Sequence, residues 1–176
     1  VLGAGGKMGP TLARMVRRGL NEIGHHQRRV FAVSRFSSPT AAADLQRYGV
    51  ETIACDLLNR AAVQALPDAS NVLFLAGQKF GTCEAPELTW VINALVPAIV
   101  AERFAGSRIV VFSTGCVYPL VPLDGRGARE DDALNPPGEY AGSCVGRKRV
   151  FTHFAKQHGT PTLLFRLCYA NDLRYG

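Results

Sequence analysis

Residues 1–9, VLGAGGKMG, decide the fold that this sequence predicts. The first two residues have the apolar character of a strand end, and a helical pattern of apolar residues begins at Met8. Between them Gly3, Gly6 and Gly9 recur at a spacing of three. In a strand–turn–helix unit, one such glycine permits the tight turn, one lets the backbone approach a pyrophosphate, and one lets the helix pack closely on the strand.

This pattern indicates a dinucleotide-binding turn, because the free amide groups at a helix N-terminus and the positive end of the helix dipole both attract phosphates. A glycine turn with a purely structural role is the alternative. The residues of the turn that we expect to contact the nucleotide are Gly3, Gly6, Lys7, Met8 and Gly9.

Beyond the turn, short apolar runs alternate with amphipathic stretches. We expect strands at 1–2, 30–33, 51–54, 71–76, 108–113 and 162–167, and helices at 8–20, 41–47, 60–66, 86–104 and 139–158. Near-continuous apolar strands between helices are typical of a parallel sheet that is covered on both faces. The sequence therefore predicts an α/β fold, a Rossmann-like doubly wound parallel sheet that forms one dinucleotide-binding domain over residues 1–176. The proline-containing stretch 118–138 lacks periodicity and is expected to be a functional loop at the carboxyl end of the fifth strand.

The composition excludes several classes of protein. The chain has 176 residues, of which 47% are hydrophobic and 19% charged, so it can bury one core. The longest apolar run, 94–101, is too short to span a bilayer, and no secretory leader is visible, so we expect no membrane partner. The net charge of +6 comes largely from arginines in and after the first helix. No aromatic residues interleave with these arginines, so we expect no nucleic-acid partner.

The cysteines and histidines show no ligand spacing. The five cysteines contain no CxxC pair, and none of the four histidines has an acidic partner at helical spacing. We therefore expect reduced thiols, a cytoplasmic location and no metal site. The chain does not begin with methionine and stops soon after the sixth strand, so we expect a fragment of a longer protein that lacks its C-terminal substrate region.

Two strand ends bear on the choice of nucleotide. The second strand ends in Ser34-Arg35, where an acid would bind the ribose hydroxyls of NAD and an arginine suits the 2′-phosphate of NADP. We expect both residues to contact the nucleotide and NADP to be favoured over NAD; simple solvent exposure of Arg35 is the alternative. Asp56-Leu57 follow the third strand. The Asp56 carboxylate either accepts a hydrogen bond from an adenine amino group or caps the next helix.

Further motifs accompany these: 34–38 (SRFSS), 75–79 (LAGQK), Asn93, 112–118 (FSTGCVY), and Glu130-Asp131 ahead of Tyr140. Together with the glycine turn and Asp56-Leu57, they resemble the extended short-chain dehydrogenase/reductases, the NAD-dependent epimerase/dehydratase group. The resemblance covers the whole chain. It implies that Thr114 assists catalysis through its hydroxyl. It also implies that the cofactor is lined by Leu75, Ala76, Gly77, Lys79 and Asn93.

The main departure from that family lies after Tyr140. In the family, the tyrosine of a YxxxK pair exchanges a proton with the substrate, and the lysine binds the nicotinamide ribose and lowers the tyrosine pKa. Here Cys144 stands where the lysine belongs. A free tyrosine titrates near pH ~10, and a neutral thiol supplies no charge to lower that pKa. Arg147 and Lys148 lie about 10–12 Å further along the helix, so we do not expect either to replace the lysine. The other candidate for a charge that lowers the tyrosine pKa is the oxidised nicotinamide ring, which is itself positive.

The resemblance implies an NAD(P)-dependent oxidoreductase, epimerase or dehydratase that acts on a hydroxyl-bearing, sugar-like or nucleotide-sugar substrate. Tyr140 and Thr114 would handle the proton, and Tyr140 would also contact the cofactor. By analogy, the long helices could form a homodimer contact. The alternative is a non-catalytic dinucleotide-binding redox sensor or regulator, which would keep the glycine turn and lose the lysine.

Overall fold

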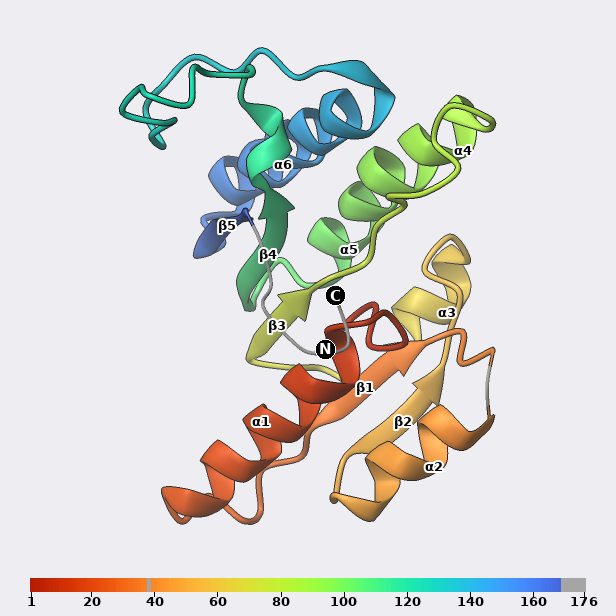
Figure 1. Ribbon diagram of the computed structural model, residues 1–176. Helices are drawn as coiled ribbons and strands as arrows, with labels where there is room; N and C mark the ends of the chain where they lie inside the picture. The colour runs from red at the N-terminus through yellow and green to blue at the C-terminus, as the bar shows by residue number, and fades with distance from the viewer. Residues whose placement is uncertain (38, 169–176) are drawn as a thin grey trace.

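The computed structural model describes residues 1–37 and 39–168 and confirms the parallel sheet. Its strands are β1 (Phe31–Ser34), β2 (Glu51–Ala54), β3 (Asn71–Phe74), β4 (Arg108–Thr114) and β5 (Thr162–Leu167). Leu2 forms parallel bridges to Val33 on β1 and to Phe74 on β3, so the first residues lie between these two strands. The spatial order is therefore β2, β1, Leu2, β3, β4, β5, with all pairs parallel (Figure 1).

Helices cover both faces of this sheet, as the sequence predicts. They are α1 (Gly9–Glu22), α2 (Pro39–Arg47), α3 (Arg60–Gln64), α4 (Pro86–Trp90), α5 (Val96–Arg103) and α6 (Gly138–His158). Ala32 packs in a buried cluster with residues of α1 and α2, while its neighbour Val33 packs in a second cluster with residues of α3, α5 and α6. Successive strand residues point to opposite faces, so these two clusters are the two sides of one sheet. Figure 1 shows the same division of the helices.

The helix expected at 86–104 is interrupted in its middle. Between α4 and α5 lies a π-helical segment, η1 (Val91–Leu95). Pro97 has no backbone N–H and cannot donate to the carbonyl four residues earlier, which favours a wider turn at this point. The π-turn contains Asn93, whose side chain is completely buried.

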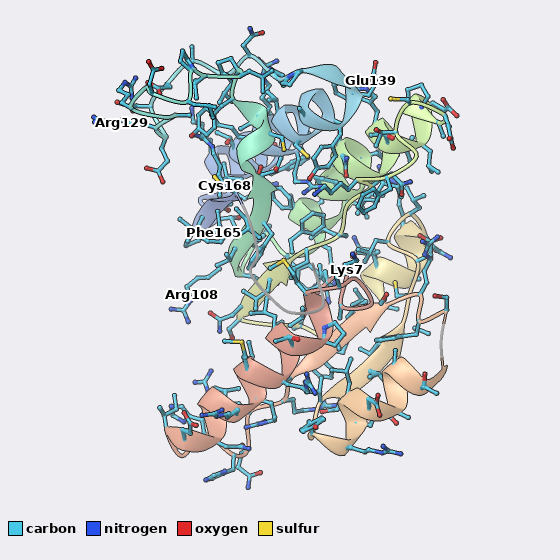
Figure 2. The ribbon with its side chains drawn as sticks, in the orientation of Figure 1. Lys7, Arg108, Arg129, Glu139, Phe165 and Cys168 are labelled. Atoms are coloured by element: carbon cyan, nitrogen blue, oxygen red, sulfur yellow. The ribbon has the colours of Figure 1, made fainter. Side chains whose placement is uncertain are left out.

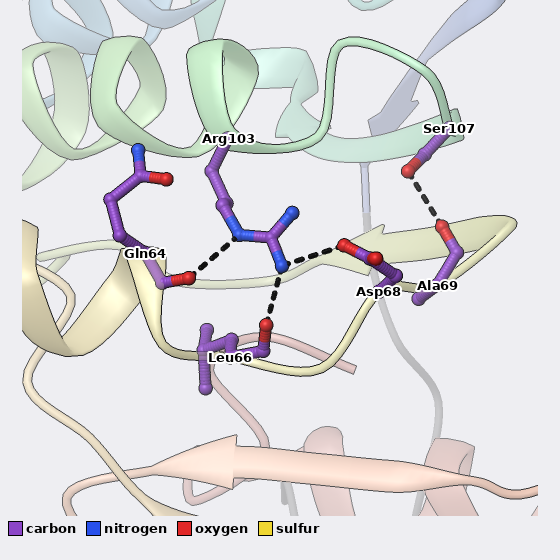
Figure 3. A network of polar contacts seen from close by, with 6 residues as sticks. All are labelled: Gln64, Leu66, Asp68, Ala69, Arg103 and Ser107. Atoms are coloured by element: carbon purple, nitrogen blue, oxygen red, sulfur yellow. Dashed lines mark hydrogen bonds and ion pairs between the residues drawn. The ribbon is translucent and has the colours of Figure 1, made fainter.

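An arginine ties the end of α5 to the segment between α3 and β3 (Figure 3). Arg103 donates from Nε to the carbonyl of Gln64 (3.2 Å), and its second nitrogen donates to the carbonyl of Leu66 and to Asp68 (2.8 Å). Ser107 donates to the carbonyl of Ala69 at 2.6 Å. These bonds satisfy loop carbonyls and hold the segment that leads into the central strand β3.

The stretch that follows β4 is irregular, as the sequence predicts. A short 3₁₀ turn, η2 (Gly115–Val117), follows β4, and neither helix nor strand lies between it and Gly138. Within the part of the chain that the structure describes, no helix is long and apolar enough to span a bilayer. No group of histidine, cysteine or acidic residues in that part could hold a metal ion, and the five cysteines there are unpaired. The domain expected over residues 1–176 includes residues 38 and 169–176, which lie outside the described residues.

Candidate functional site

A cavity of about 660 Å³ opens where the glycine turn, β1, β2 and β3 end. It lies at the carboxyl edge of the sheet, where the strand order reverses, and open α/β sheets bind ligands at such an edge. The predicted site residues that line it are Gly3, Gly6, Ser34, Arg35, Asp56, Leu57, Leu75, Ala76 and Gly77. A second cavity of about 720 Å³ lies at the opposite edge and is lined by none of the predicted site residues.

The three spaced glycines meet different demands. Gly3 has φ +81°, and a Cβ on it would lie 2.5 Å from the backbone nitrogen of Ala76. A Cβ on Gly9 would lie 2.3 Å from the carbonyl oxygen of Ala4. At Gly6, by contrast, the nearest atom would be 3.6 Å away, which is ordinary contact. Packing within the chain therefore explains Gly3 and Gly9 but not Gly6.

The start of α1 presents the positive end of the helix dipole next to the glycine turn. Met8 occupies the N-cap position, and its side chain makes no capping hydrogen bond. The amide of Gly9 donates to the carbonyl of Gly6 at 3.2 Å, and Pro10 has no N–H. Lys7 is an exposed residue of the same turn (Figure 2). The turn therefore combines the positive end of a helix dipole with a nearby cation.

The strand ends beside the turn hold polar side chains at the rim. Arg35 is exposed directly after β1, where its guanidinium can reach a ligand in the cavity. Asp56 accepts a hydrogen bond from the amide of Leu58 at 3.0 Å. The cap of α3 is Asn59, whose side chain accepts from Ala62, so the alternative that Asp56 caps this helix is wrong. Asp56 therefore stays available at the cavity rim.

The two predicted proton-handling residues lie together at the end of β4. The Thr114 hydroxyl accepts from the amide of Cys116 at 3.2 Å, and Tyr140, in the first turn of α6, packs against the buried cluster of Val117, Cys144 and Val145. Burial raises the pKa of the Tyr140 phenol above its ordinary value, and the neighbouring Cys144 thiol acts in the same direction. Hydrogen bonding to Thr114 and the charge of Arg147 act against this rise in the pKa.

Asn93 lies behind the cavity wall rather than in it. Its Oδ1 accepts from the amide of Gln78 and its Nδ2 donates to the carbonyl of the same residue, both at 2.9 Å. Nδ2 also donates to the hydroxyl of Ser143 (2.9 Å), which in turn donates to the carbonyl of Tyr140 (2.8 Å). Asn93 therefore joins the backbone that lines the cavity to the helix that holds Tyr140.

Arg147 belongs to this network, although we did not expect it to replace the missing lysine. Its side chain turns into the protein, with the residue only 5% exposed. One terminal nitrogen donates to the carbonyl of Phe112 (2.9 Å) and the other to Oδ1 of Asn93 (2.6 Å). A Cβ on Gly77 would lie 2.5 Å from this guanidinium. The helical spacing of Tyr140, Cys144 and Arg147 was a visible signal, but the inward turn of the side chain was not.

The remaining predicted residue, Lys79, is exposed in the loop after β3, and its ammonium lies 5.7 Å from the ring of Phe80. Cys168, the last described residue, lies close to Gly115 at the end of β4: a Cβ on that glycine would be 2.7 Å from its sulfur (Figure 2). The structure thus gathers the predicted residues at one edge of the sheet, with the glycine turn at one end and Tyr140 and Thr114 at the other.

The sheet order, the glycine turn and the cavity at the switch point define a Rossmann-like fold. The NAD dependent epimerase/dehydratase family matches residues 1–170. The chain belongs to this family.

Solved structures show the same fold. The structure of MoeE5 in complex with UDP-glucose and NAD is 24% identical, with a TM-score of 0.73, over 95% of this chain and 52% of that chain. UDP-glucose 4-epimerase from Thermotoga maritima is 18% identical (TM-score 0.77; 94% and 53% covered), and UDP-glucuronic acid 4-epimerase from Bacillus cereus is 19% identical (0.75; 94% and 54%). No curated protein sequence matches. The chain spans about half the length of these solved chains.

Proposed function

We propose that this chain is the dinucleotide-binding part of an NAD(P)-dependent oxidoreductase, epimerase or dehydratase. The observation that supports this most strongly is Gly6, which faces the cavity and has no packing reason to lack a side chain. The proposed substrate is a hydroxyl-bearing, sugar-like molecule or nucleotide-sugar. Similar solved structures are complexes with UDP-glucose and NAD and with UDP-glucuronic acid and NAD, which is in keeping with that class.

The residues present fit a dinucleotide along the whole cavity. The backbone at Gly6 and the positive end of the α1 dipole would hold the pyrophosphate, with Lys7 beside them. Asp56 would accept from the adenine, and the backbone at 75–77 would flank the middle of the ligand. A nicotinamide dinucleotide, when bound, supplies a carrier for a hydride.

Tyr140 and Thr114 would then handle the proton. The Tyr140 phenolate would accept the proton of a substrate hydroxyl as the carbon gives up its hydride, and would return the proton in the reverse step. The Thr114 hydroxyl lies beside the phenol and would orient the same substrate oxygen. Thr114 ends β4, and Tyr140 lies in the first turn of α6, the helix that Asn93 joins to the cavity wall.

We further propose a preference for NADP. It rests on Arg35, which follows β1 at the cavity rim, where a guanidinium suits a 2′-phosphate. Similar solved structures are complexes with NAD, so the test compares the two nucleotides directly. Calorimetric titration of the natural full-length protein should give tighter binding of NADP⁺ than of NAD⁺. Absence of binding by either nucleotide would contradict the proposed function.

The alternative, a non-catalytic dinucleotide sensor, is favoured by Cys144 at the position where a lysine would serve catalysis. A measurement of enzymatic turnover distinguishes the enzyme from the non-catalytic sensor. With UDP-glucose and UDP-glucuronic acid as trial substrates, Tyr140→Phe should lower the rate about 100-fold or more while nucleotide affinity stays the same. A protein that binds the nucleotide, yet shows no turnover that depends on Tyr140, would be a sensor.

Three expectations remain proposals. They are the extent of one domain over residues 1–176, a homodimer contact through the long helices, and a cytoplasmic location. Gel filtration with light scattering of the full-length protein tests the homodimer, and a mass equal to one chain would contradict it.

A further inference from the structure

Tyr140 faces a physical difficulty in the role proposed for it. It has to become a phenolate, but its phenol is partly buried, and burial disfavours the charged form. The residue one turn along α6, Cys144, is buried and supplies no positive charge. The site therefore needs a cation that lies close to the phenol and stays in place.

The groups around Tyr140 on each neighbouring element limit the choice. On α6 these groups are Cys144 and Arg147; β4 supplies the neutral hydroxyl of Thr114, and η2 supplies Cys116. Two nearby charged side chains are turned to other partners. Glu139 accepts from the indole nitrogen of Trp90 at 2.6 Å, and Arg166 on β5 donates to the hydroxyl of Tyr118. Arg147 is left as the cation that acts on the phenol.

The charge of Arg147 is not neutralised by an acid. Its hydrogen-bond partners among the described residues are an amide oxygen and a backbone carbonyl, both neutral, and its Nε is buried without a partner. A buried cation with no anionic partner is costly, and it favours the ionised form of nearby acidic groups. The groups in its reach that can ionise are Tyr140 and Cys144.

The guanidinium is also held rigidly. Asn93, its acceptor, is itself fixed by two bonds to Gln78 and one to Ser143. Gly77, with no side chain, leaves the space that the guanidinium fills. A charge held in this way does not have to rearrange while a proton moves, which is the condition under which electrostatic stabilisation is most effective.

We propose that Arg147 is a positioning residue for the reaction, and that its fixed guanidinium supplies the positive charge that stabilises the Tyr140 phenolate. The inference rests on the proposed function, because only a tyrosine that exchanges a proton needs such a charge. Arg147 acts through Tyr140 and through the Asn93 network. It takes over the electrostatic task for which position 144 offers no cation.

The chain contains a matched control. Arg17 on α1 is also buried (7% exposed), also donates to two neutral oxygens, the carbonyls of His25 and Arg28, and also has an Nε without a partner. It lies on the other face of the sheet, in the layer of α1 and α2. Loss of Arg17 should therefore disturb the protein as much as loss of Arg147 without changing the charge near Tyr140.

The test is a titration of Tyr140 in the full-length protein without substrate. A fluorinated tyrosine placed at position 140 gives a single ¹⁹F signal, and its more acidic phenol titrates where the fold survives. Arg147→Gln should raise the pKa of residue 140. Arg147→Lys should keep the pKa near that of the unsubstituted protein, and Arg17→Gln should leave it unchanged.

Further variants guard against misfolding. Arg147→Met removes the charge and fills the space with an apolar side chain, and Asn93→Asp sets a carboxylate against the guanidinium; both should raise the same pKa. Circular dichroism shows which variants are folded. An unchanged pKa in any folded variant that alters this charge would overturn the proposal, as would an equal rise in Arg17→Gln. The titration needs no turnover, so its outcome is separate from the test of the proposed function.

Discussion

The two ends of the candidate site are built from different parts of the chain. At the glycine turn the close contacts are between backbone atoms: Gly3 against Ala76, and Gly9 against Ala4. At the Tyr140 end the contacts are between side chains of distant segments, and Asn93 and Arg147 alone are 54 residues apart. The first kind of site needs only the right glycines in the right order. The second depends on how several elements pack.

The largest expected effect comes from removing the side chain of Asn93, which lies at the centre of the buried hydrogen-bond network near Tyr140. Asn93→Ala leaves Arg147, Ser143 and both polar groups of Gln78 without their partner, and should lower the free energy of unfolding by about 3–5 kcal/mol. Asn59→Ala, which removes a helix cap, should cost only about 1 kcal/mol. Urea denaturation measures both. Equal costs would mean that the buried network stabilises no more than a surface cap.

One added methyl group in the glycine turn is expected to destabilise the protein. Gly9→Ala forces a Cβ against the carbonyl of Ala4 and should destabilise the protein by about 1–3 kcal/mol and weaken nucleotide binding. Gly19→Ala lies in the same helix with open space around it, and should instead stabilise the protein by about 0.5–1 kcal/mol. Thermal unfolding compares the two. The account of the turn fails if both substitutions shift stability in the same direction.

A smaller effect, on nucleotide affinity, is expected for Arg35 at the cavity rim. Arg35→Ala removes an exposed cation, so NADP⁺ affinity should fall by about 1 kcal/mol, roughly fivefold, with NAD⁺ affinity unchanged. Arg47→Ala removes another exposed arginine, on α2, and serves as the control in the same calorimetric titrations. Equal losses for both nucleotides would show that Arg35 does not read the 2′-phosphate.

The smallest effect is on the pH dependence of stability. Burial raises the pKa of the Cys144 thiol above 9.0 and that of Tyr140 above 10.0. The folded state then holds these protons more tightly than the unfolded state, so the stabilisation is complete below pH 9 and is lost as the pH rises through the raised values. Urea midpoints should fall above pH 9, and less steeply in Cys144→Ala. The same slope in the variant would contradict burial of this thiol.

The sequence predicts the backbone end well, because its information is local. The spacing of Gly3, Gly6 and Gly9 identifies the turn, and the apolar runs identify the parallel sheet with helices on both faces. Helix positions follow from periodicity, and the observed bounds differ from the predicted ones by a few residues. The exception is the π-turn at Asn93, because the spacing of apolar residues does not distinguish a π-turn from an α-helix.

The side-chain end could be predicted only in part. The positions of Thr114 and Tyr140 followed from motifs, and the structure brings the two together. The role of Asn93 behind the wall, and the inward turn of Arg147, could not be predicted, because they depend on the space left by Gly77 and on acceptors 35 and 54 residues away in the sequence. An arginine on a helix is usually exposed, so the helical spacing alone argued against a role for Arg147 beside Tyr140.

A crystal structure of the full-length protein with a bound nicotinamide dinucleotide would test the central claim most directly. The account predicts the pyrophosphate against Gly6 and the N-terminal end of α1, and the nicotinamide ring near Tyr140 and Thr114, with Arg147 still bonded to Asn93. A nucleotide bound elsewhere, or one whose nicotinamide points away from Tyr140, would contradict it.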